Sequence, residues 1–393
     1  MHSSKKYKDL VVITSRFPYP LEKGDKLRAY YQIVELSKHF NVHLISTSEH
    51  EIAVEDRDQL EKVCSSINVY VIKSWEKWIG AGLNLLNQQP IQVGYFYHRR
   101  IHRKIKEKLK SIKPDHIYCQ LIRAAEYVKN YHACDKTIDY MDALSKGVER
   151  RSEKASGLRK WIFDLEFKRL MKYENSIFEY FENHTIISEQ DRNYIFHKNR
   201  IKITVVPNGV DRSYLNFENE GVKKTTDILF TGNMSYPPNI TASLYIINEV
   251  LPKLPKTTKV TIAGANPVKE VQLLKAENVD VTGFVEDLRT YYASHKIFVA
   301  PMFLGTGLQN KLLEAMAIGI PCITTSMANN ALNATPEKEI LIADNAAAFQ
   351  TQIERLLNDQ DLRDSIAVNA RNFIRSNYDW ETVTKELIEL IGV

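Results

Sequence analysis

The sequence has few cysteines, and none of them lie close together. Its four cysteines are Cys64, Cys119, Cys134 and Cys322, and no C-x-x-C pair occurs. Zinc ribbons need paired cysteines and small secreted folds need a denser disulfide framework, so both classes are excluded. The spacing instead predicts a reduced protein, and we expect a cytoplasmic location.

Long apolar runs and common nucleotide-binding signatures are also absent. No stretch reaches the ~18 uninterrupted apolar residues of a transmembrane helix, so the sequence predicts no membrane span. No G-x-G-x-x-G opens the first predicted helix and no G-x-x-x-x-G-K-[ST] occurs, which argues against a Rossmann dehydrogenase and a P-loop NTPase. The eleven histidines show no metal-ligand spacing, so we predict no metal site.

Charge is distributed unevenly along the 393 residues. Residues 1–200 carry 35 basic and 26 acidic side chains, whereas residues 201–393 carry 18 and 22. A basic half suggests that it meets a polyanion, which is nucleic acid, anionic lipid or a phosphorylated substrate. Nucleic acid is the least favoured of these partners, because no recognised binding module matches.

The densest basic run covers residues 99–113, and aromatic and aliphatic residues precede it. Tyr95, Phe96 and Tyr97 come directly before the run, and further upstream lie Trp75, Trp78, Ile79, Leu83, Leu85 and Leu86. Apolar side chains beside a dense cationic face are typical of an interfacial helix on anionic lipid. The alternative is that the basic face is merely solvated and that Trp75 and Leu83 are core residues.

Apolar periodicity predicts an α/β protein with two doubly wound, Rossmann-like domains. A β-branched run at residues 10–14 predicts a buried parallel strand, and apolar residues at helical spacing follow it up to residue 40. The alternation stops in a polar stretch and then resumes. We expect the following organisation: a first domain over 1–207, a linker over 208–225, a second domain over 226–377 and a final helical segment over 378–393.

Ligands of doubly wound sheets bind at the carboxyl ends of the strands, so the loops there hold the candidate residues. In the second domain a loop with Gly305 and Gly307 leads into a helix with Lys311 in its first turn. A lysine is disfavoured at a helix N-terminus, and a bound diphosphate would offset that cost. Glu314 lies on the same helix face as a hydrogen-bond acceptor for ribose hydroxyls. A plain βαβ turn with a surface lysine is the alternative.

Two loops of the first domain also carry candidates. Gly24 precedes a predicted helix, whose N-terminal N–H groups favour an anion, although a glycine there is often only a turn residue. Arg123 follows the strand predicted at residues 116–119, where it is placed to hold an acceptor phosphate. A surface or core-capping arginine is the alternative.

The segment Pro301–Pro321 reads Pro-x-x-x-Gly-x-Gly-x-x-x-Lys-x-x-Glu-Ala-x-Ala-x-Gly-x-Pro and resembles the donor loop of glycosyltransferase family 4. Residues 206–211 resemble the interdomain segment of that family, and Gly232 matches its glycine at the donor diphosphate. Gly283 and Phe284 lie in a segment that resembles its base-contacting turn. The resemblance implies the GT-B fold, in which two domains face each other across a cleft and a C-terminal helix crosses back to the first.

The closer similarity is to bacterial sugar transferases associated with exopolysaccharide assembly. These share Lys/Arg-Gly-Asp-Lys-x-Arg, Thr-Gly-x-Met and Gln-Asn-Lys-x-x-Glu-Ala with residues 23–28, 231–234 and 309–315. The shared motifs imply substrate binding by a further set of residues. These are Gly24, Asp25, Arg28, Asn233, Gln309 and Asn310.

The sequence departs from the family pattern at three places. Thr306 stands where the family has the first of two glutamates, and Asn233 begins a stretch without the usual arginine and lysine. Lys311 is therefore expected to replace that cationic pair at the diphosphate. Asp139 and Asp142 occupy the position of a His-Asp pair that faces the sugar, and one of them is expected to orient the sugar or the incoming hydroxyl. An N-cap role for Asp142 is equally compatible with the sequence.

The resemblance implies a retaining glycosyltransferase without cofactor or metal. The expected donor is a UDP- or GDP-sugar, and the expected acceptor is lipid-linked or a polysaccharide. An anionic membrane surface is a further expected partner. Two alternatives remain open, a GT-B shell that binds nucleotide without catalysis and a nucleotide-sugar epimerase.

Overall fold

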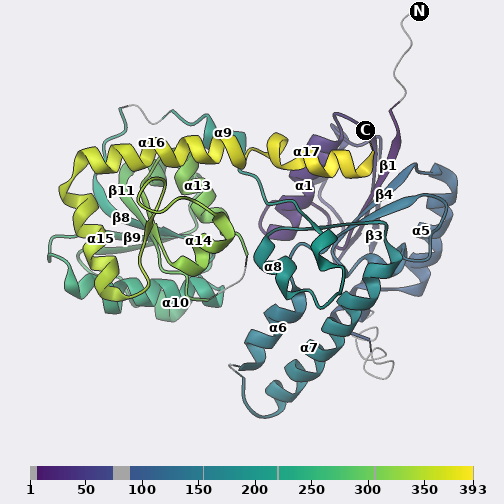
Figure 1. Cartoon of the computed structure of the whole chain (residues 1–393), viewed down its shortest axis with the longest axis horizontal. Coiled ribbons are helices and arrows are strands. Elements are labelled where there is room, and N and C mark those ends of the chain that lie inside the picture. The colour runs from purple at the N-terminus through teal and green to yellow at the C-terminus, as the bar shows by residue number, and fades with distance from the viewer. Residues whose placement is uncertain (1–6, 74–88, 154, 219–220, 305–306, 393) are drawn as a thin grey trace, which may run out of the picture. The chain divides into compact units, whose positions relative to one another are not determined.

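The computed structural model describes residues 7–73, 89–153, 155–218, 221–304 and 307–392. The chain divides into two units, one made of residues 1–207 and 383–393 and the other of residues 208–382. Each unit is built around a parallel β-sheet with packed helices (Figure 1). No helix within the described ranges combines the length and apolarity needed to cross a bilayer.

In the described part of the first unit, seven parallel strands form a sheet with the order β3-β2-β1-β4-β5-β6-β7. Its strands are β1 (Asp9–Thr14), β2 (Asn41–Ser48), β3 (Ser66–Val71), β4 (His116–Gln120), β5 (Asp135–Asp139), β6 (Asn183–Ile186) and β7 (Thr204–Val205). Its helices of four or more residues are α1 (Gly24–Leu36), α2 (Val54–Glu61), α4 (Ile91–Phe96), α5 (Arg99–Ile112), α6 (Leu144–Glu153), α7 (Gly157–Ile177) and α8 (Glu189–Tyr194).

Strand β1 shows why the apolar run near the N-terminus forms a buried strand. Successive side chains of a strand point to opposite faces, so an uninterrupted apolar run suits a sheet that is covered on both sides. Leu10 and Val12 belong to one core cluster, and Val11 and Ile13 belong to another. The C-terminal helix α17 (Trp380–Ile391) contributes Leu387 to the first cluster, so it covers that face of the sheet.

Helix α7 holds the beginnings of two other helices through buried carboxylates. Glu166 accepts hydrogen bonds from the backbone N–H groups of Ile91 (2.7 Å) and Gln92 (3.0 Å) at the start of α4. Glu174 accepts from the N–H (2.9 Å) and the hydroxyl (2.5 Å) of Ser145 at the start of α6. The first N–H groups of a helix lack partners within it, so these carboxylates satisfy donors that would otherwise be buried unpaired.

In the described part of the second unit, six parallel strands have the order β10-β9-β8-β11-β12-β13. The strands are β8 (Thr226–Thr231), β9 (Val260–Ala263), β10 (Val279–Gly283), β11 (His295–Ala300), β12 (Cys322–Thr324) and β13 (Leu341–Ile342). The helices are α9 (Arg212–Leu215), α10 (Pro237–Tyr245), α11 (Lys269–Gln272), α12 (Leu288–Ser294), α13 (Asn310–Ile318), α14 (Ser326–Leu332), α15 (Ala346–Asn358) and α16 (Gln360–Asn377).

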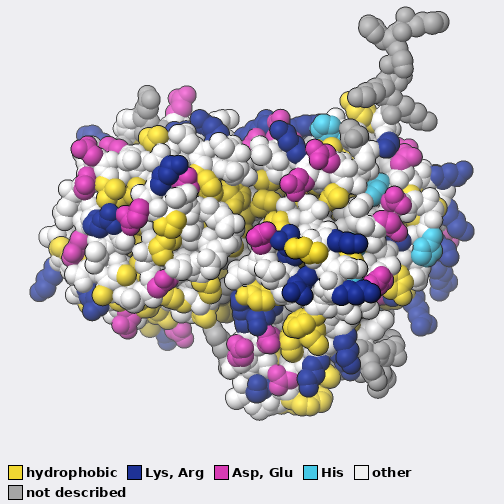
Figure 2. All heavy atoms as spheres, in the orientation of Figure 1, with side chains coloured by type: hydrophobic (Ala, Val, Ile, Leu, Met, Phe, Trp, Pro, Cys, Tyr) yellow, Lys and Arg dark blue, Asp and Glu magenta, His cyan; other side chains and the backbone are white. Residues whose placement is uncertain are grey.

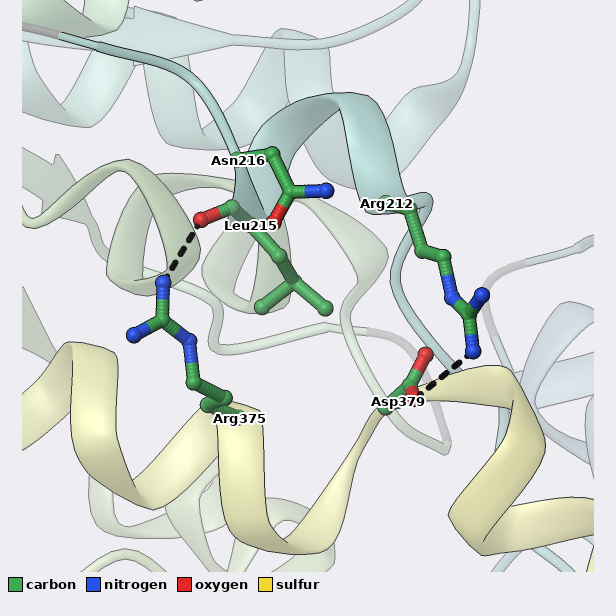
Figure 3. Close-up of a pocket in the computed structure, with 5 residues that line it drawn as sticks. All are labelled: Arg212, Leu215, Asn216, Arg375 and Asp379. Carbon is green, nitrogen blue, oxygen red and sulfur yellow. Dashed lines mark hydrogen bonds and ion pairs between the residues drawn. The ribbon is translucent and has the colours of Figure 1, made fainter.

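The stretch at residues 208–225, expected as a linker, lies in the second unit and includes α9. Leu215 is buried in the core of this unit, and its carbonyl accepts hydrogen bonds from Arg371 and from Arg375. Arg212 forms an ion pair with Asp379 just after α16. A cavity of about 290 Å³ lies here (Figure 3), and it is lined by Arg212, Leu215, Asn216, Arg375 and Asp379. The segment is therefore tied to the end of α16 by specific polar contacts.

The basic run at residues 99–113 folds mainly as α5. Ile101, Ile105 and Leu109 point into the core, while Arg103 and Lys104 are exposed. The upstream apolar residues at 75–86 lie outside the described residues. Helix α5 therefore contributes cationic surface, and its own apolar face is occupied by the core.

Candidate functional site

The strand order of the second unit places a topological switch between β8 and β11, because successive connections run from β8 in opposite directions. Crevices at the carboxyl ends of such strands are the ligand-binding places of doubly wound sheets. The loops after β8 and β11 lie there, and α13 begins directly after the second loop. This helix carries Lys311 and Glu314.

Lys311 holds its ammonium group among neutral and apolar atoms. Its Nζ donates a hydrogen bond to Asn239 Oδ1, lies 3.9 Å from Met302 Sδ and lies 4.7 Å from the ring centre of Phe230. Burial lowers the pKa of Lys311 to about 7, although the charge of Glu314 opposes this shift. An anion bound beside Nζ would restore the charged form, so the position suits a phosphate group.

Two glycines allow the backbone to come close to Lys311. A Cβ on Gly232 would lie 2.5 Å from Asn239 Nδ2 and 3.2 Å from Lys311 Nζ. A Cβ on Gly264, in the loop after β9, would lie only 1.8 Å from the carbonyl oxygen of Gly232. Only glycine fits at either position, so backbone atoms without a side chain lie next to the ammonium group.

Glu314 lies one turn along α13 and is held by a tyrosine. The hydroxyl of Tyr292 is 3.1 Å from Glu314 Oε2 and 2.7 Å from Thr231 Oγ1 at the end of β8. Burial raises the pKa of Glu314 to about 7, while the hydrogen bond from Tyr292 opposes the shift. The side chain is only partly buried, so it remains accessible as an acceptor for ligand hydroxyls.

Replacing Glu314 with glutamine tests whether its carboxylate receives ribose hydroxyls. Glu314→Gln keeps the shape but weakens a charge-assisted hydrogen bond, so UDP affinity should fall by about 1–3 kcal/mol. Isothermal titration with UDP and with 2′,3′-dideoxy-UDP measures the effect. The variant should discriminate less between the two nucleotides than the wild type does, and equal discrimination would remove Glu314 from the ribose contact.

The other candidates of the second unit lie around the same edge, in different roles. Asn233 Oδ1 accepts from the N–H (3.0 Å) and the hydroxyl of Ser235, so this side chain stabilises its own turn. Gln309 and Asn310 are partly exposed at the start of α13. Gly307 follows Thr306, which lies outside the described residues. Gly283 ends β10, and Phe284 after it is 78% exposed, as a ring that stacks on a nucleobase would be before binding.

In the first unit, Asp139 and Arg28 form a fully buried ion pair. Arg28 Nε donates to Asp139 Oδ2 (2.6 Å) and Nη2 donates to Oδ1 (3.1 Å), and both side chains are 0% exposed. Thr185 Oγ1 donates a third hydrogen bond to Oδ1 (3.0 Å). The expected catalytic role of Asp139 and the expected substrate contact of Arg28 are not supported by this placement. The ion pair and the hydrogen bond from Thr185 instead connect α1, β5 and β6 within the core.

Asp142 is placed differently, because its side chain is partly exposed just after β5. Burial raises its pKa to about 7, with Asp191 adding to the shift and Arg123 opposing it. The capping alternative gains no support, since Asp191 and Glu174 accept the first N–H groups around α6. Asp142 is thus a partly exposed carboxyl group at the carboxyl end of β5.

Two arginines flank one aromatic ring at the carboxyl ends of β1 and β4. The guanidinium groups of Arg16 and Arg123 lie 5.3 and 5.4 Å from the ring centre of Phe96. Arg123 also donates to Gln92 (2.7 Å), and its Nε is buried without a hydrogen bond. Burial and the nearby charge of Arg16 lower the pKa of Arg123. The strand order places its topological switch between β1 and β4, so the pair lies where this sheet would bind an anion.

The remaining two candidates lie at the start of α1. Asp25 accepts from Arg16 Nη1 (2.5 Å), which links the helix to the arginine pair. Gly24 begins the helix, and a Cβ there would make ordinary contact with Met141, at 3.5 Å. Asp25 is thus part of the arginine cluster, whereas the structure gives Gly24 no special steric role.

Sequence reasoning missed several residues that shape these two sites. Arg16 comes two residues after β1, so its place in a strand-end loop was a usable signal. Asn239 and Tyr292 lie within helices or at their ends, and no motif marks them as neighbours of Lys311 and Glu314. Their roles depend on packing across the sheet edge.

A family model matches part of the second unit. Residues 225–359 match the family model described as Glycosyl transferases group 1. This part of the chain is therefore similar to group 1 glycosyltransferases. An uncharacterised 44.6 kDa protein of the cps region of Klebsiella pneumoniae is 25% identical over 97% of this chain and 99% of its own length. The capsular polysaccharide biosynthesis glycosyltransferase CapM of Staphylococcus aureus is 29% identical over 118 residues, 29% of this chain and 30% of CapM.

Solved structures share the architecture. Anabaena Alr3699/HepE, solved in complex with UDP-glucose, superposes with a TM-score of 0.70 at 13% identity over 98% of this chain and 99% of that one. The expected GT-B fold, with two parallel-sheet Rossmann-like domains, is confirmed. The expectation of glycosyl transfer is supported by the match of residues 225–359 to the group 1 model and by the similarity to CapM.

Proposed function

We propose that this group 1 glycosyltransferase moves a sugar from a nucleotide-sugar donor to a lipid-linked or polysaccharide acceptor, with retention and without a metal. The observation that best supports the proposal is the placement of Lys311. Its ammonium group donates a hydrogen bond to a neutral side chain, next to two glycines at the topological switch of the second sheet. The capsular and cps-region relatives support the acceptor class. The UDP-glucose complex of HepE supports a UDP-sugar as donor. We place the reaction in the cytoplasm.

The proposed donor position assigns one task to each residue of the second unit. The backbone at Gly232, the start of α13 and Lys311 meet the diphosphate, Glu314 accepts from the ribose, and Phe284 stacks on the base. Positive charge at the departing diphosphate lowers the barrier, because the leaving group gains negative charge in the transition state. Lys311 thus does the work that a divalent cation does in metal-dependent transferases.

The proposed chemistry has one bond broken and one formed on the same face of the sugar. The bond from the anomeric carbon to the donor phosphate oxygen breaks, and the acceptor oxygen takes its place. The departing phosphate oxygen receives the acceptor proton, so the protein supplies position and charge rather than a strong base. Asp142 orients the acceptor hydroxyl, and Arg16 and Arg123 bind a phosphate of the acceptor, which supports a lipid-linked acceptor.

Thermal unfolding with a panel of nucleotides tests this proposal first. UDP at 100 times its dissociation constant should add ~2.7 kcal/mol to the free energy of unfolding. GDP and dTDP at the same concentration are the controls. UDP-sugar consumption should then depend on an added lipid-phosphate acceptor. Epimerisation without acceptor would establish the epimerase alternative, and tight binding without any turnover would establish the non-catalytic shell.

The low pKa of Lys311 predicts a pH dependence of diphosphate binding. A bound diphosphate raises the pKa of Lys311 above about 7. The part of the UDP affinity that comes from the charged lysine is therefore fully present below about pH 7 and declines as the pH rises. UDP affinity should fall by up to roughly tenfold per pH unit above about pH 7, with a proton taken up on binding. Calorimetry in buffers of different ionisation enthalpy measures that uptake.

Uridine and Lys311→Met provide the controls for this pH dependence. Uridine lacks the diphosphate, so its affinity should not decline over the same range. Lys311→Met should bind UDP weakly and lose the proton uptake. Proton uptake that persists in this variant would assign the titration to another group.

A further inference from the structure

Helix α7 carries an exposed stripe that the core does not use. Leu158, Trp161, Leu165, Lys168 and Lys172 recur at spacings of three and four residues, which places them on one helix face. Leu158 is 72% exposed and Trp161 is 61% exposed, and both lysines are exposed. The stripe is apolar at the N-terminal end of the helix and cationic farther along.

The other face of α7 already packs against the first unit. Leu170, Tyr173 and Ile177 are buried in its core, and Glu166 and Glu174 cap two helices. The apolar stripe residues are absent from every core cluster of the described chain. Helices α6 and α7 run side by side as a hairpin, and hydrophobic, basic and some acidic side chains are visible near its free end (Figure 2). The apolar residues of the stripe are therefore not part of the hydrophobic core.

The charges of α7 itself have one predominant sign, whereas the neighbouring α6 carries both signs, with Glu149 and Glu153 beside Arg150 and Arg151. The basic residues of α7 are Arg159, Lys160, Lys168, Arg169 and Lys172. Of its acidic residues, Glu166 and Glu174 are buried, and Asp164 lies 3.7 Å from Lys160 as an ion pair. A second copy of this chain would bring like charges together at such a surface. An anionic bilayer offers a complementary charge together with an apolar interior.

We propose that the free end of the α6–α7 hairpin docks on an anionic lipid bilayer. Leu158 and Trp161 enter the boundary between headgroups and acyl chains, where tryptophan is favoured. Lys168 and Lys172 bind lipid phosphates, and their long side chains reach the headgroup layer. This surface is separate from the donor and acceptor residues, so the proposal holds whether or not the chain transfers a sugar.

Co-sedimentation of the full chain with vesicles tests the proposal. The probe is phosphatidylcholine vesicles with and without about 30% phosphatidylglycerol, at low and high salt. The wild type should bind the anionic vesicles alone and should dissociate at high salt, because screening weakens the lysine contacts. L158S/W161S should bind at least roughly tenfold more weakly than the wild type, and K168E/K172E should behave likewise.

Leu273→Ser is the matched control, because Leu273 is equally exposed (74%) but lies in the second unit. This control should bind vesicles as the wild type does. Circular dichroism and UDP binding should be unchanged in all variants, which separates docking from folding and from donor binding. Wild-type protein that ignores anionic vesicles overturns the proposal. A wild-type dimer that becomes monomeric in L158S/W161S, without any vesicle binding, would instead assign the stripe to a subunit interface.

Discussion

Lys311→Ala should lower kcat/KM for sugar transfer by roughly 30- to 1,000-fold, which corresponds to about 2–4 kcal/mol of transition-state stabilisation. The reason is that α13 brings Lys311 to the crevice beside Gly232 and Gly264, where its ammonium group donates a hydrogen bond to the neutral side chain of Asn239. Stability should fall little or even rise, since burial disfavours the charged form of this lysine. Initial rates at varied UDP-sugar concentration measure the loss.

Lys253→Ala is the matched control for Lys311→Ala. Lys253 is exposed and ends the helical segment that begins with α10, so it lies toward the opposite edge of the same sheet. Its removal should leave transfer unchanged. If Lys311→Ala also leaves kcat/KM unchanged, the diphosphate binds elsewhere.

Asp139→Ala should destabilise the first unit by about 3–5 kcal/mol, because it leaves the buried guanidinium of Arg28 without its charge partner. Arg28 also donates to the carbonyl of Pro207 (3.3 Å), so the disturbance reaches the end of this unit. Urea unfolding followed by circular dichroism measures the loss. Removing both charges in R28M/D139L should cost less than the single change, because no unpaired charge remains.

Asp142→Asn provides the contrast that separates structure from chemistry. Burial raises the pKa of Asp142, so the neutral amide should not destabilise the fold near about pH 8. Transfer should nevertheless decline, since the carboxylate is proposed to orient the acceptor hydroxyl. A stable, fully active Asp142→Asn protein would remove Asp142 from the site.

The fold was largely predictable because apolar runs and helical spacings report directly on burial. The run at residues 10–14 and the final helix at 380–391 lie where the periodicity placed them. Strand β3 was missed, since its six residues are all only partly buried and mix polar with apolar side chains. The charged residues 150–182 predict one long helical stretch from the sequence, but the structure has two helices there, α6 and α7, and α7 begins at Gly157, whose φ is +58°.

The candidate site was predictable only for residues that lie close together in the sequence. Lys311 and Glu314 share one helix, so their common face followed from the spacing. The pairing of Arg28 with Asp139 joins residues 111 positions apart, and only the packing of α1 against β5 reveals it. The same holds for Asn239, whose side chain reaches Lys311 from another helix.

The glycine wall beside Lys311 has a consequence for how much sequence change the donor crevice accepts. In a library with every amino acid at each site, selection for active protein should return only glycine at positions 232 and 264, because any Cβ there meets neighbouring atoms at 2.5 and 1.8 Å. Gly283 has no atom within 4 Å of such a Cβ and a φ of +74°, so asparagine and aspartate should survive there as well. Divergent relatives are therefore free to change the residue at position 283 while positions 232 and 264 stay glycine.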